Sequence, residues 1–241
     1  MLNNMEFERP KGWRKGQFLF NFLILKMHLL LCAATTFEIQ PTIDFIHSEK
    51  IPGVTILITG VGMVATTFSL TKSVYSQRPD FILQAGVGGC LDEKLPLSKI
   101  VLVENENIGE LGVEENGDFK NLFDLNLLQK NSFPWKDGKL SNDVEVLKAT
   151  GLAIVNGVTV NEISTSKSRI DYYKNEFNAS VESMEGAALH YVALQEKIPF
   201  LQMRSLSNFV GERDKSKWVM QIAIANLNIE LQRIITKFLN R

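Results

Sequence analysis

A cluster of charged and amide side chains follows two apolar stretches in the C-terminal half of the chain. Glu185 stands where an apolar strand at residues 179–181 gives way to a helical run, and Arg204 lies late in a second apolar strand. Charged side chains are almost never buried without a partner, so Arg204 requires a carboxylate or an anionic ligand nearby. The spacing predicts one cleft that binds a polar small molecule and is faced by Glu182, Glu185, Arg204, Ser207 and Asn208.

Glu185 also has a simpler interpretation. A helix is expected over residues 186–195, and negative charge is favourable at a helix N-terminus. The nearby Arg204 and Asn208 favour a role in the cleft, but a carboxylate that only complements the helix dipole stays open as an alternative.

Two glycine-rich turns follow predicted strands, at residues 60–62 and 86–89. Glycine permits close backbone approach and positive φ angles, and ligands of such sheets bind at the carboxyl ends of the strands. We therefore expect both turns to border the same site as Glu38, Asn161 and Glu185. Neither turn fits a dinucleotide fingerprint or a P-loop.

Two motifs together carry a family resemblance. Ser-Met-Glu-Gly-Ala-Ala at 183–188 and Met-Arg-Ser-Leu-Ser-Asn at 203–208 resemble the paired signature of the nucleoside phosphorylase and methylthioadenosine nucleosidase superfamily. Within it the chain is most similar to the futalosine hydrolases, which are nucleosidases of menaquinone biosynthesis. The resemblance runs from about Met27 to the C-terminus. It implies a nucleoside phosphorylase-like fold, a purine nucleoside substrate and a homo-oligomer.

The resemblance also implies roles for individual residues. Cleavage of an N-glycosidic bond passes through an oxocarbenium-like sugar and needs a base for water, anchors for the sugar and donors to the leaving purine. Glu38 would be the base, and Arg204 would position the water or Glu38. Glu185 would bind the ribose hydroxyls, with Met184 beneath the sugar. An alternative for Glu38 is a carboxylate in the first turn of a helix. The other expected substrate-binding residues are Gly62, Gly86, Val87, Gly88, Val160, Asn161 and Ser207.

Asn208 is the third expected catalytic residue, and by resemblance it indicates which base leaves. Adenine-specific nucleosidases of the superfamily carry Asp at this place, whereas Asn resembles enzymes that act on 6-oxopurines. An amide can donate to N7 and to a carbonyl oxygen, and Ser207 would orient that amide. The implied reaction is hydrolysis of futalosine to hypoxanthine and dehypoxanthine futalosine. Alternatives are a methylthioadenosine/adenosylhomocysteine nucleosidase, an inosine phosphorylase and, in another class, a non-catalytic nucleoside-binding protein.

The distribution of arginine favours water over phosphate as the nucleophile. Phosphorylases of the superfamily hold phosphate with arginines near the first strands and glycine-rich loops. This chain has no arginine between Arg14 and Arg78. Because the guanidinium fork suits phosphate, its absence there favours a hydrolase.

Composition limits the other partners. The formal charge is −1, from 26 basic and 27 acidic residues, which argues against a nucleic-acid surface. Cys32 and Cys90 lie far apart without metal-ligand spacing, and the three histidines are scattered. We expect reduced cysteines in a cytoplasmic protein that has no metal site, no cofactor and no membrane association.

Short apolar runs alternate with amphipathic segments from Met27 onward. This pattern predicts a single α/β domain over residues 27–241, a three-layer α/β/α arrangement with a mostly parallel central sheet. Residues 105–150 break the rhythm, and we expect them to form an active-site flap or an oligomer contact.

The first 26 residues imitate a signal peptide, with basic residues before an apolar run at 18–25. That run is far shorter than the roughly 18 residues that a membrane helix needs. We expect residues 1–26 to be an extension outside the fold.

Overall fold

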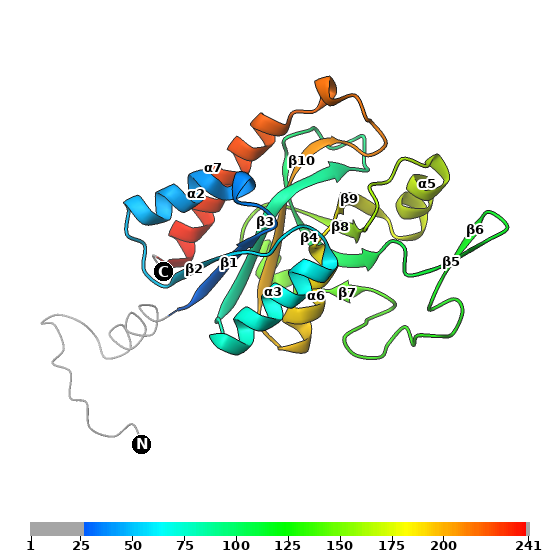
Figure 1. Ribbon diagram of the computed structural model, residues 1–241, viewed down its shortest axis with the longest axis horizontal. Coiled ribbons are helices and arrows are strands. Elements are labelled where there is room, and N and C mark those ends of the chain that lie inside the picture. Colours follow the sequence, from blue (N-terminus) through cyan, green and yellow to red (C-terminus); the bar gives the residue numbers. More distant parts are fainter. Residues whose placement is uncertain (1–26, 240–241) are drawn as a thin grey trace, which may run out of the picture.

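The computed structural model describes residues 27–239, so the expected place of residues 1–26 outside the fold stays a prediction. Figure 1 shows a strongly twisted sheet with helices packed against it. The strands of the main sheet are β1 (Leu29–Ala33), β2 (Val54–Ile58), β3 (Phe81–Cys90), β4 (Ile100–Ile108), β7 (Leu140–Ser141), β8 (Ala153–Thr159), β9 (Ala179–Ser183) and β10 (Phe200–Phe209).

The sheet is mixed and partly closed, which corrects the expected mostly parallel sheet. β1, β2 and β3 run parallel, but β9 is antiparallel to β3 and β4 is antiparallel to β10. β10 also pairs with β3, so β3, β10, β4, β8 and β9 form a ring. Length explains the closure: the first four residues of β3, a strand of ten residues, pair with β1, and its last two pair with β9.

Six α-helices pack against the sheet within the described residues, in accordance with the predicted α/β class. They are α2 (Thr36–Ser48), α3 (Met63–Ser76), α4 (Val144–Lys148), α5 (Lys167–Glu176), α6 (Gly186–Gln195) and α7 (Met220–Leu239). α2 and α7 pack together on one face, and α3 and α6 pack together on the other (Figure 1).

The two faces of β1 explain its continuous apolar run. Leu29 and Leu31 join the core beneath α2 and α7, whereas Leu30 and Cys32 join the core beneath α3 and α6. Alternate residues of a strand point to opposite faces, so a strand covered on both sides needs apolar residues at every position. β1 and β3 are thereby fixed at the centre of the molecule.

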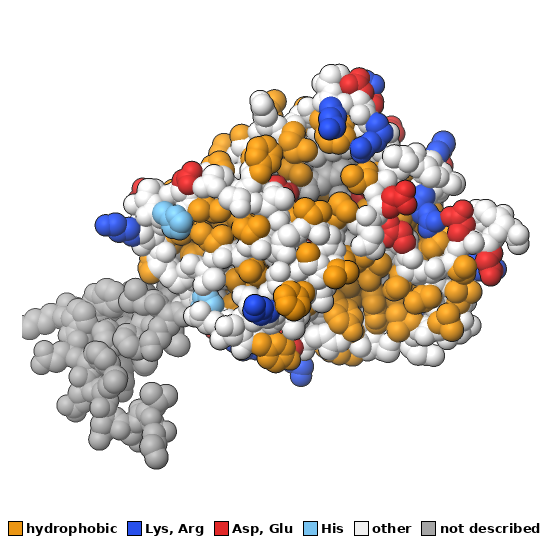
Figure 2. Space-filling view, viewed as in Figure 1, with side chains coloured by type: hydrophobic (Ala, Val, Ile, Leu, Met, Phe, Trp, Pro, Cys, Tyr) orange, Lys and Arg blue, Asp and Glu red, His pale blue; other side chains and the backbone are white. Residues whose placement is uncertain are grey.

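Residues 105–150 are more regular than expected. β4 continues to Ile108, and the hairpin of β5 (Gly112–Glu115) and β6 (Asp118–Asn121) follows. This hairpin packs on α5, where the ring centroids of Phe119 and Tyr172 lie 5.1 Å apart. Apolar side chains gather on the face of the molecule around β5 and β7 (Figure 2). No helix within residues 27–239 is long and apolar enough to cross a bilayer.

Candidate active site

A cavity of about 340 Å³ lies at the carboxyl ends of β1, β3, β9 and β10. The first turn of α2 and the segment 210–220, which connects β10 to α7, complete its walls. Ligands of α/β sheets bind at this end of the strands, and small-molecule pockets have comparable volumes. The position is the one that the sequence predicted for the cleft.

Glu38 reaches this cavity from the first turn of α2. Its Oε1 atom accepts a hydrogen bond from the backbone N–H of Val87 at 3.0 Å. Its Oε2 atom accepts hydrogen bonds from the backbone N–H and the hydroxyl of Thr35, at 3.1 and 2.9 Å. Glu38 is therefore both a helix-capping carboxylate and a residue of the cavity wall, and the two interpretations of it are compatible.

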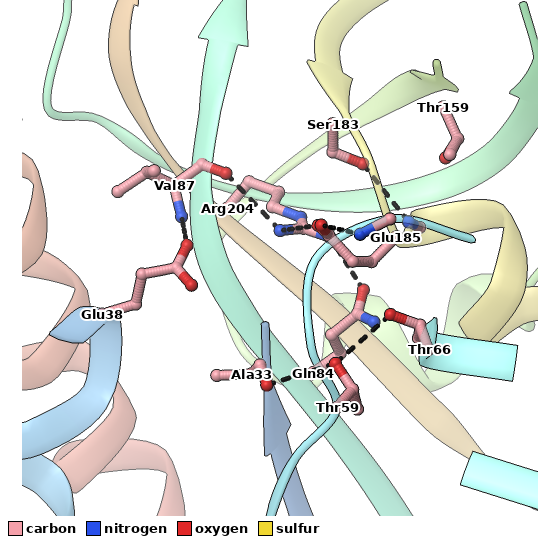
Figure 3. A network of polar contacts seen from close by, with 12 residues as sticks. Ala33, Glu38, Thr59, Thr66, Gln84, Val87, Thr159, Ser183, Glu185 and Arg204 are labelled. Carbon is pink, nitrogen blue, oxygen red and sulfur yellow. Dashed lines mark hydrogen bonds and ion pairs between the residues drawn. The ribbon is translucent and has the colours of Figure 1, made fainter. Parts of the chain in front are cut away.

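Glu185 and Arg204 form a buried ion pair beside the cavity (Figure 3). Nη1 of Arg204 lies 3.4 Å from Oε2 of Glu185, and Nη2 donates to Oε1 of Gln84 at 2.9 Å. The other oxygen of Glu185 accepts from the backbone N–H of Gly62 at 3.0 Å. Glu185 makes no side-chain cap of α6, so its carboxylate is directed to Arg204 and the glycine turn.

Gly86 explains how Arg204 and Glu38 approach the same point. A Cβ atom at this position would lie 2.5 Å from Nη1 of Arg204 and 2.8 Å from Oε1 of Glu38. Real side chains do not tolerate such contacts, so only glycine leaves room for both charged groups. The guanidinium of Arg204 thus lies between the carboxylates of Glu38 and Glu185 (Figure 3).

Asn208 lines the cavity at the end of β10. Its Oδ1 atom accepts a hydrogen bond from the hydroxyl of Ser207 at 2.9 Å, and Nδ2 donates to the backbone carbonyl of Phe209 at 3.0 Å. An amide nitrogen carries two hydrogens, so one N–H of Asn208 stays available to a ligand. Ser207 fixes the orientation of this amide.

The family model of the phosphorylase superfamily matches residues 28–239. The chain belongs to this superfamily. It is 28% identical over 188 residues to the futalosine hydrolase of Thermus thermophilus, which covers 77% of this chain and 82% of that protein. It is 26% identical over 183 residues to the 5′-methylthioadenosine/S-adenosylhomocysteine nucleosidase of Buchnera aphidicola, covering 71% and 73% respectively.

A solved structure of the superfamily shows the same fold. A mutant of the Helicobacter pylori nucleosidase MTAN, with 5′-methylthioadenosine in its active site, superposes with a TM-score of 0.71. The sequence identity is 16%, and the match covers 88% of this chain and 99% of that one. The resemblance that the two motifs carried is thereby confirmed at the level of the superfamily and its fold.

The other predicted site residues of this superfamily member divide into two groups. Val87, Gly88, Met184 and Ser207 line the cavity, and Gly62 and Gly86 border it through the contacts given above. The structure does not bring Val160 and Asn161 to the cavity wall. Val160 is fully buried in the core beside α5. Asn161 is exposed, and its backbone N–H donates to the carboxylate of Glu110.

Several cavity residues were not predicted as site residues. Phe37 and Ile163 contribute apolar wall, and Arg213 and Trp218 belong to the segment after β10. Segments without a periodic pattern give no sequence signal for the face they present. Glu182 was expected to face the cleft, without an assigned role, and it lines the cavity. Burial raises the pKa of its carboxyl group, and hydrogen bonds from Ser164 partly offset this rise.

A second polar cluster lies behind the ion pair. Oε1 of the fully buried Glu106 accepts from the hydroxyl of Thr159, and that hydroxyl oxygen accepts from the N–H of Ala187 in the first turn of α6. Burial raises the pKa of Glu106 to about 7. Burial lowers the pKa of the neighbouring His190, whose Nδ1–H donates to the carbonyl of Leu140, to about 4.

The basic side chains near the cavity differ in their state: Arg204 is buried and paired, whereas Arg213 is exposed. Within residues 27–239, no group of three or more Cys, His, Asp and Glu side chains is arranged to hold a metal ion. The guanidinium of Arg204 is occupied by Glu185 and Gln84. Among the described residues that line the cavity, Arg213 is the only basic one, and it is exposed at the rim.

Proposed function

We propose that this protein hydrolyses the N-glycosidic bond of futalosine, releasing hypoxanthine and dehypoxanthine futalosine, a step of menaquinone biosynthesis. The observation that carries the proposal is the placement of Arg204 between Glu38 and Glu185 on one side of the cavity, with Asn208 on its wall. The T. thermophilus relative bears the name of this activity, and the B. aphidicola relative is named a nucleosidase.

Glu38 is suited to activate water. Each of its oxygens already accepts hydrogen bonds, from the N-cap residue Thr35 or from Val87 of β3, so the carboxylate is held in one orientation. A carboxylate oxygen has two acceptor positions, and Oε1 uses one of them on Val87. The second remains for a water molecule, from which Glu38 would take the proton as the hydroxyl attacks C1′ of the sugar.

Glu185 and Met184 are suited to hold the ribose. Arg204 and Gly62 each contact one oxygen of the Glu185 carboxylate and hold it in place. Hydrogen bonds from sugar hydroxyls to a fixed carboxylate strengthen as positive charge develops on the ring, because the electrostatic field is already in place. Met184, which lines the same cavity, would pack beneath the sugar.

Asn208 is suited to support the leaving base. Its free N–H would donate to N7 or O6 of hypoxanthine, where negative charge develops as the bond breaks. Donation to both atoms at once requires the amide to release the carbonyl of Phe209. A neutral amide donates at every working pH, which suits a base that presents only acceptors along this edge.

Water is favoured over phosphate as the nucleophile. A phosphate group needs cationic or multiple backbone donors, and the arginine nearest to Glu38 is already neutralised by Glu185. Arg213 belongs to the segment after β10, and its side chain is exposed to solvent. The arrangement therefore supports hydrolysis.

A second candidate is hydrolysis of 5′-methylthioadenosine or S-adenosylhomocysteine. It is supported by the B. aphidicola relative, whose identity to this chain is close to that of the futalosine hydrolase. The two candidates share the water and ribose chemistry and differ in the base. Asn208, in place of a carboxyl group, favours the 6-oxopurine.

Product analysis tests the proposal. Purified protein is incubated with futalosine, inosine and 5′-methylthioadenosine in phosphate-free buffer that contains a chelator, and the products are separated by chromatography. We expect hypoxanthine from futalosine as the fastest release. Adenine as the main product would favour the second candidate, and ribose 1-phosphate formation on addition of phosphate would indicate a phosphorylase.

A further inference from the structure

The helix that follows Glu185 is not capped by its own N-cap side chain. Glu185 is the N-cap residue of α6, so Gly186 and Ala187 are the first two residues of this helix, and both are buried. An N-cap side chain ordinarily accepts a hydrogen bond from the N–H of the second or third helical residue. The carboxylate of Glu185 is directed instead to Arg204 and Gly62. Other groups must therefore satisfy the first N–H groups of α6.

Two hydroxyl groups take the place of that cap. The N–H of Gly186 donates to Oγ of Ser183 at 3.3 Å (Figure 3). The N–H of Ala187, the donor that an N-cap side chain would use, donates to Oγ1 of Thr159 at 2.8 Å. Thr159 is fully buried at the end of β8. The carboxylate of Glu185 is thereby left for the cavity.

Glu106 fixes the orientation of the Thr159 hydroxyl. A hydroxyl has one hydrogen, and Thr159 donates it to Oε1 of Glu106 at 3.0 Å. The lone pairs of the same oxygen then face the N–H of Ala187. A carboxylate behind this hydroxyl also suits the positive end of the helix dipole. Neither Glu106 nor Thr159 lines the cavity, so both can act on the site only through α6.

Two glycines make room for the carboxylate of Glu106. A Cβ atom on Gly157 of β8 would lie 2.6 Å from its Oε2 atom, and a Cβ atom on Gly186 would lie 2.5 Å from it. The Cβ atom on Gly186 would also lie 2.3 Å from Nε2 of the buried Gln202. Real side chains do not tolerate such contacts. The backbone at the start of α6 is thus packed directly against two buried polar side chains, which restrict its position.

We propose that Thr159 and Glu106 are positioning residues, which cap the Ala187 N–H of α6 in place of Glu185 and so keep the Glu185 carboxylate free to bind the ribose. The assignment rests on the proposed nucleosidase function, in which Glu185 holds the sugar. Without the Thr159 hydroxyl, the N–H of Ala187 competes for the carboxylate of its own N-cap residue, Glu185. The expected consequence is a weaker preference for the ribose hydroxyls.

Two substitutions at Thr159 form a matched pair. Thr159→Val keeps the shape of the side chain and removes the hydroxyl, whereas Thr159→Ser keeps the hydroxyl. The measured quantities are the ratios of kcat/KM for futalosine to kcat/KM for its 2′-deoxy and 3′-deoxy counterparts, each compared with the parent protein. This comparison cancels the different intrinsic reactivities of the nucleosides. We expect at least one ratio to fall about tenfold in Thr159→Val, the effect of one hydrogen bond to a charged group, and both to stay within about twofold of the parent in Thr159→Ser.

A double variant covers the case in which Thr159→Val does not fold. Thr159→Val alone leaves the buried Glu106 without its donor, whereas Thr159→Val/Glu106→Leu replaces both polar groups by apolar groups of similar size. The double variant also removes Glu106 as a substitute acceptor for Ala187, and it should show the same fall in the ratio. Thr236→Val, the same change at an exposed position of α7, is the control and should leave both ratios unchanged.

A merely structural role of Thr159 would lower stability without a change in the preference for the ribose hydroxyls. Both ratios within about twofold of the parent in a folded Thr159→Val or double variant would therefore overturn the assignment, as would an equal fall in Thr159→Ser. If the parent releases no base from any nucleoside, the proposed hydrolysis fails. The assignment is then tested by calorimetry, from the ratios of Kd for inosine and its 2′-deoxy and 3′-deoxy counterparts, with the same expected and contradicting results.

Discussion

Nη1 of Arg204 lies 3.4 Å from Oε2 of Glu185, and 2% and 7% of the two side chains are exposed. The pair is held from both ends, because Gln84 accepts from Arg204 and Gly62 donates to Glu185. A buried ion pair contributes little net stability, but the loss of one partner leaves an uncompensated charge. The positions of these two side chains are thus fixed before a substrate binds.

Glu185→Gln should impair both substrate binding and turnover. The amide keeps one acceptor but loses the charge that balances Arg204 and attracts the ribose hydroxyls. We expect KM to rise and kcat to fall, since a ribose anchor acts in the ground state and in the transition state. Steady-state kinetics check this result, with Glu145→Gln as the exposed control. Unchanged KM and kcat would reduce Glu185 to a structural residue.

Glu38→Gln should retain nucleoside binding and lose turnover. Loss of a general base typically lowers the rate about 10²- to 10⁴-fold. The helix-capping role adds a cost in stability of about 1 kcal/mol, since an amide nitrogen cannot accept from Thr35 or Val87. Calorimetry with a non-hydrolysed nucleoside analogue measures the retained binding, and single-turnover kinetics measure the lost turnover. A rate within threefold of the parent would exclude Glu38 as the base.

Gly86→Ala should lower activity strongly although it changes no charged residue. The new methyl group would lie within 3 Å of both Nη1 of Arg204 and Oε1 of Glu38, so at least one must move. Overpacking of this kind costs about 1–3 kcal/mol of stability. We expect a folded protein with at least 10²-fold lower kcat/KM, because displacement of a positioning group by about 1 Å costs this much. Wild-type activity in this variant would contradict the crowded geometry around Gly86.

Much of this site could be predicted from the sequence, because Glu185, Arg204 and Asn208 stand at or near the ends of apolar strands. The closure of the sheet could not be predicted. The antiparallel pairings of β4 with β10 and of β9 with β3 join segments that are distant in the sequence, and such pairings leave no local pattern. Val160 was expected in the pocket, yet strand alternation turns it into the core. Trp218 belongs to an aperiodic segment, and only the structure shows that it lines the cavity.

Glu106 and His190 should give opposite pH dependences of stability. The pKa of Glu106 is raised from a usual value of 4.5 to about 7. Between these two pH values the native state binds more protons than the unfolded state, so stability falls as pH rises. Relative to 6.5, the pKa of His190 is lowered to about 4, so stability rises with pH between 4 and 6.5. The two effects nearly cancel from pH 4.5 to 6.5.

Single substitutions should reveal each effect. In Glu106→Gln, the free energy of unfolding should rise with pH between 4 and 6.5, by up to about 1.4 kcal/mol per pH unit. In His190→Gln it should fall between pH 4.5 and 7 by a similar amount per unit. Urea denaturation across this range measures both slopes. Slopes of the same sign in the two variants would show that these buried groups do not titrate in this way.

The most direct test of the account is the ratio of kcat/KM for futalosine to kcat/KM for its 6-amino counterpart, measured in the parent protein and in Asn208→Asp. We expect a ratio far above one in the parent. An ionised carboxylate at position 208 would repel O6 and N7, so in the variant cleavage of futalosine should drop about 10²- to 10³-fold, and the ratio should fall with it. A parent ratio at or below one, or a ratio that Asn208→Asp leaves unchanged, would contradict the assignment of this cavity to a 6-oxopurine nucleoside.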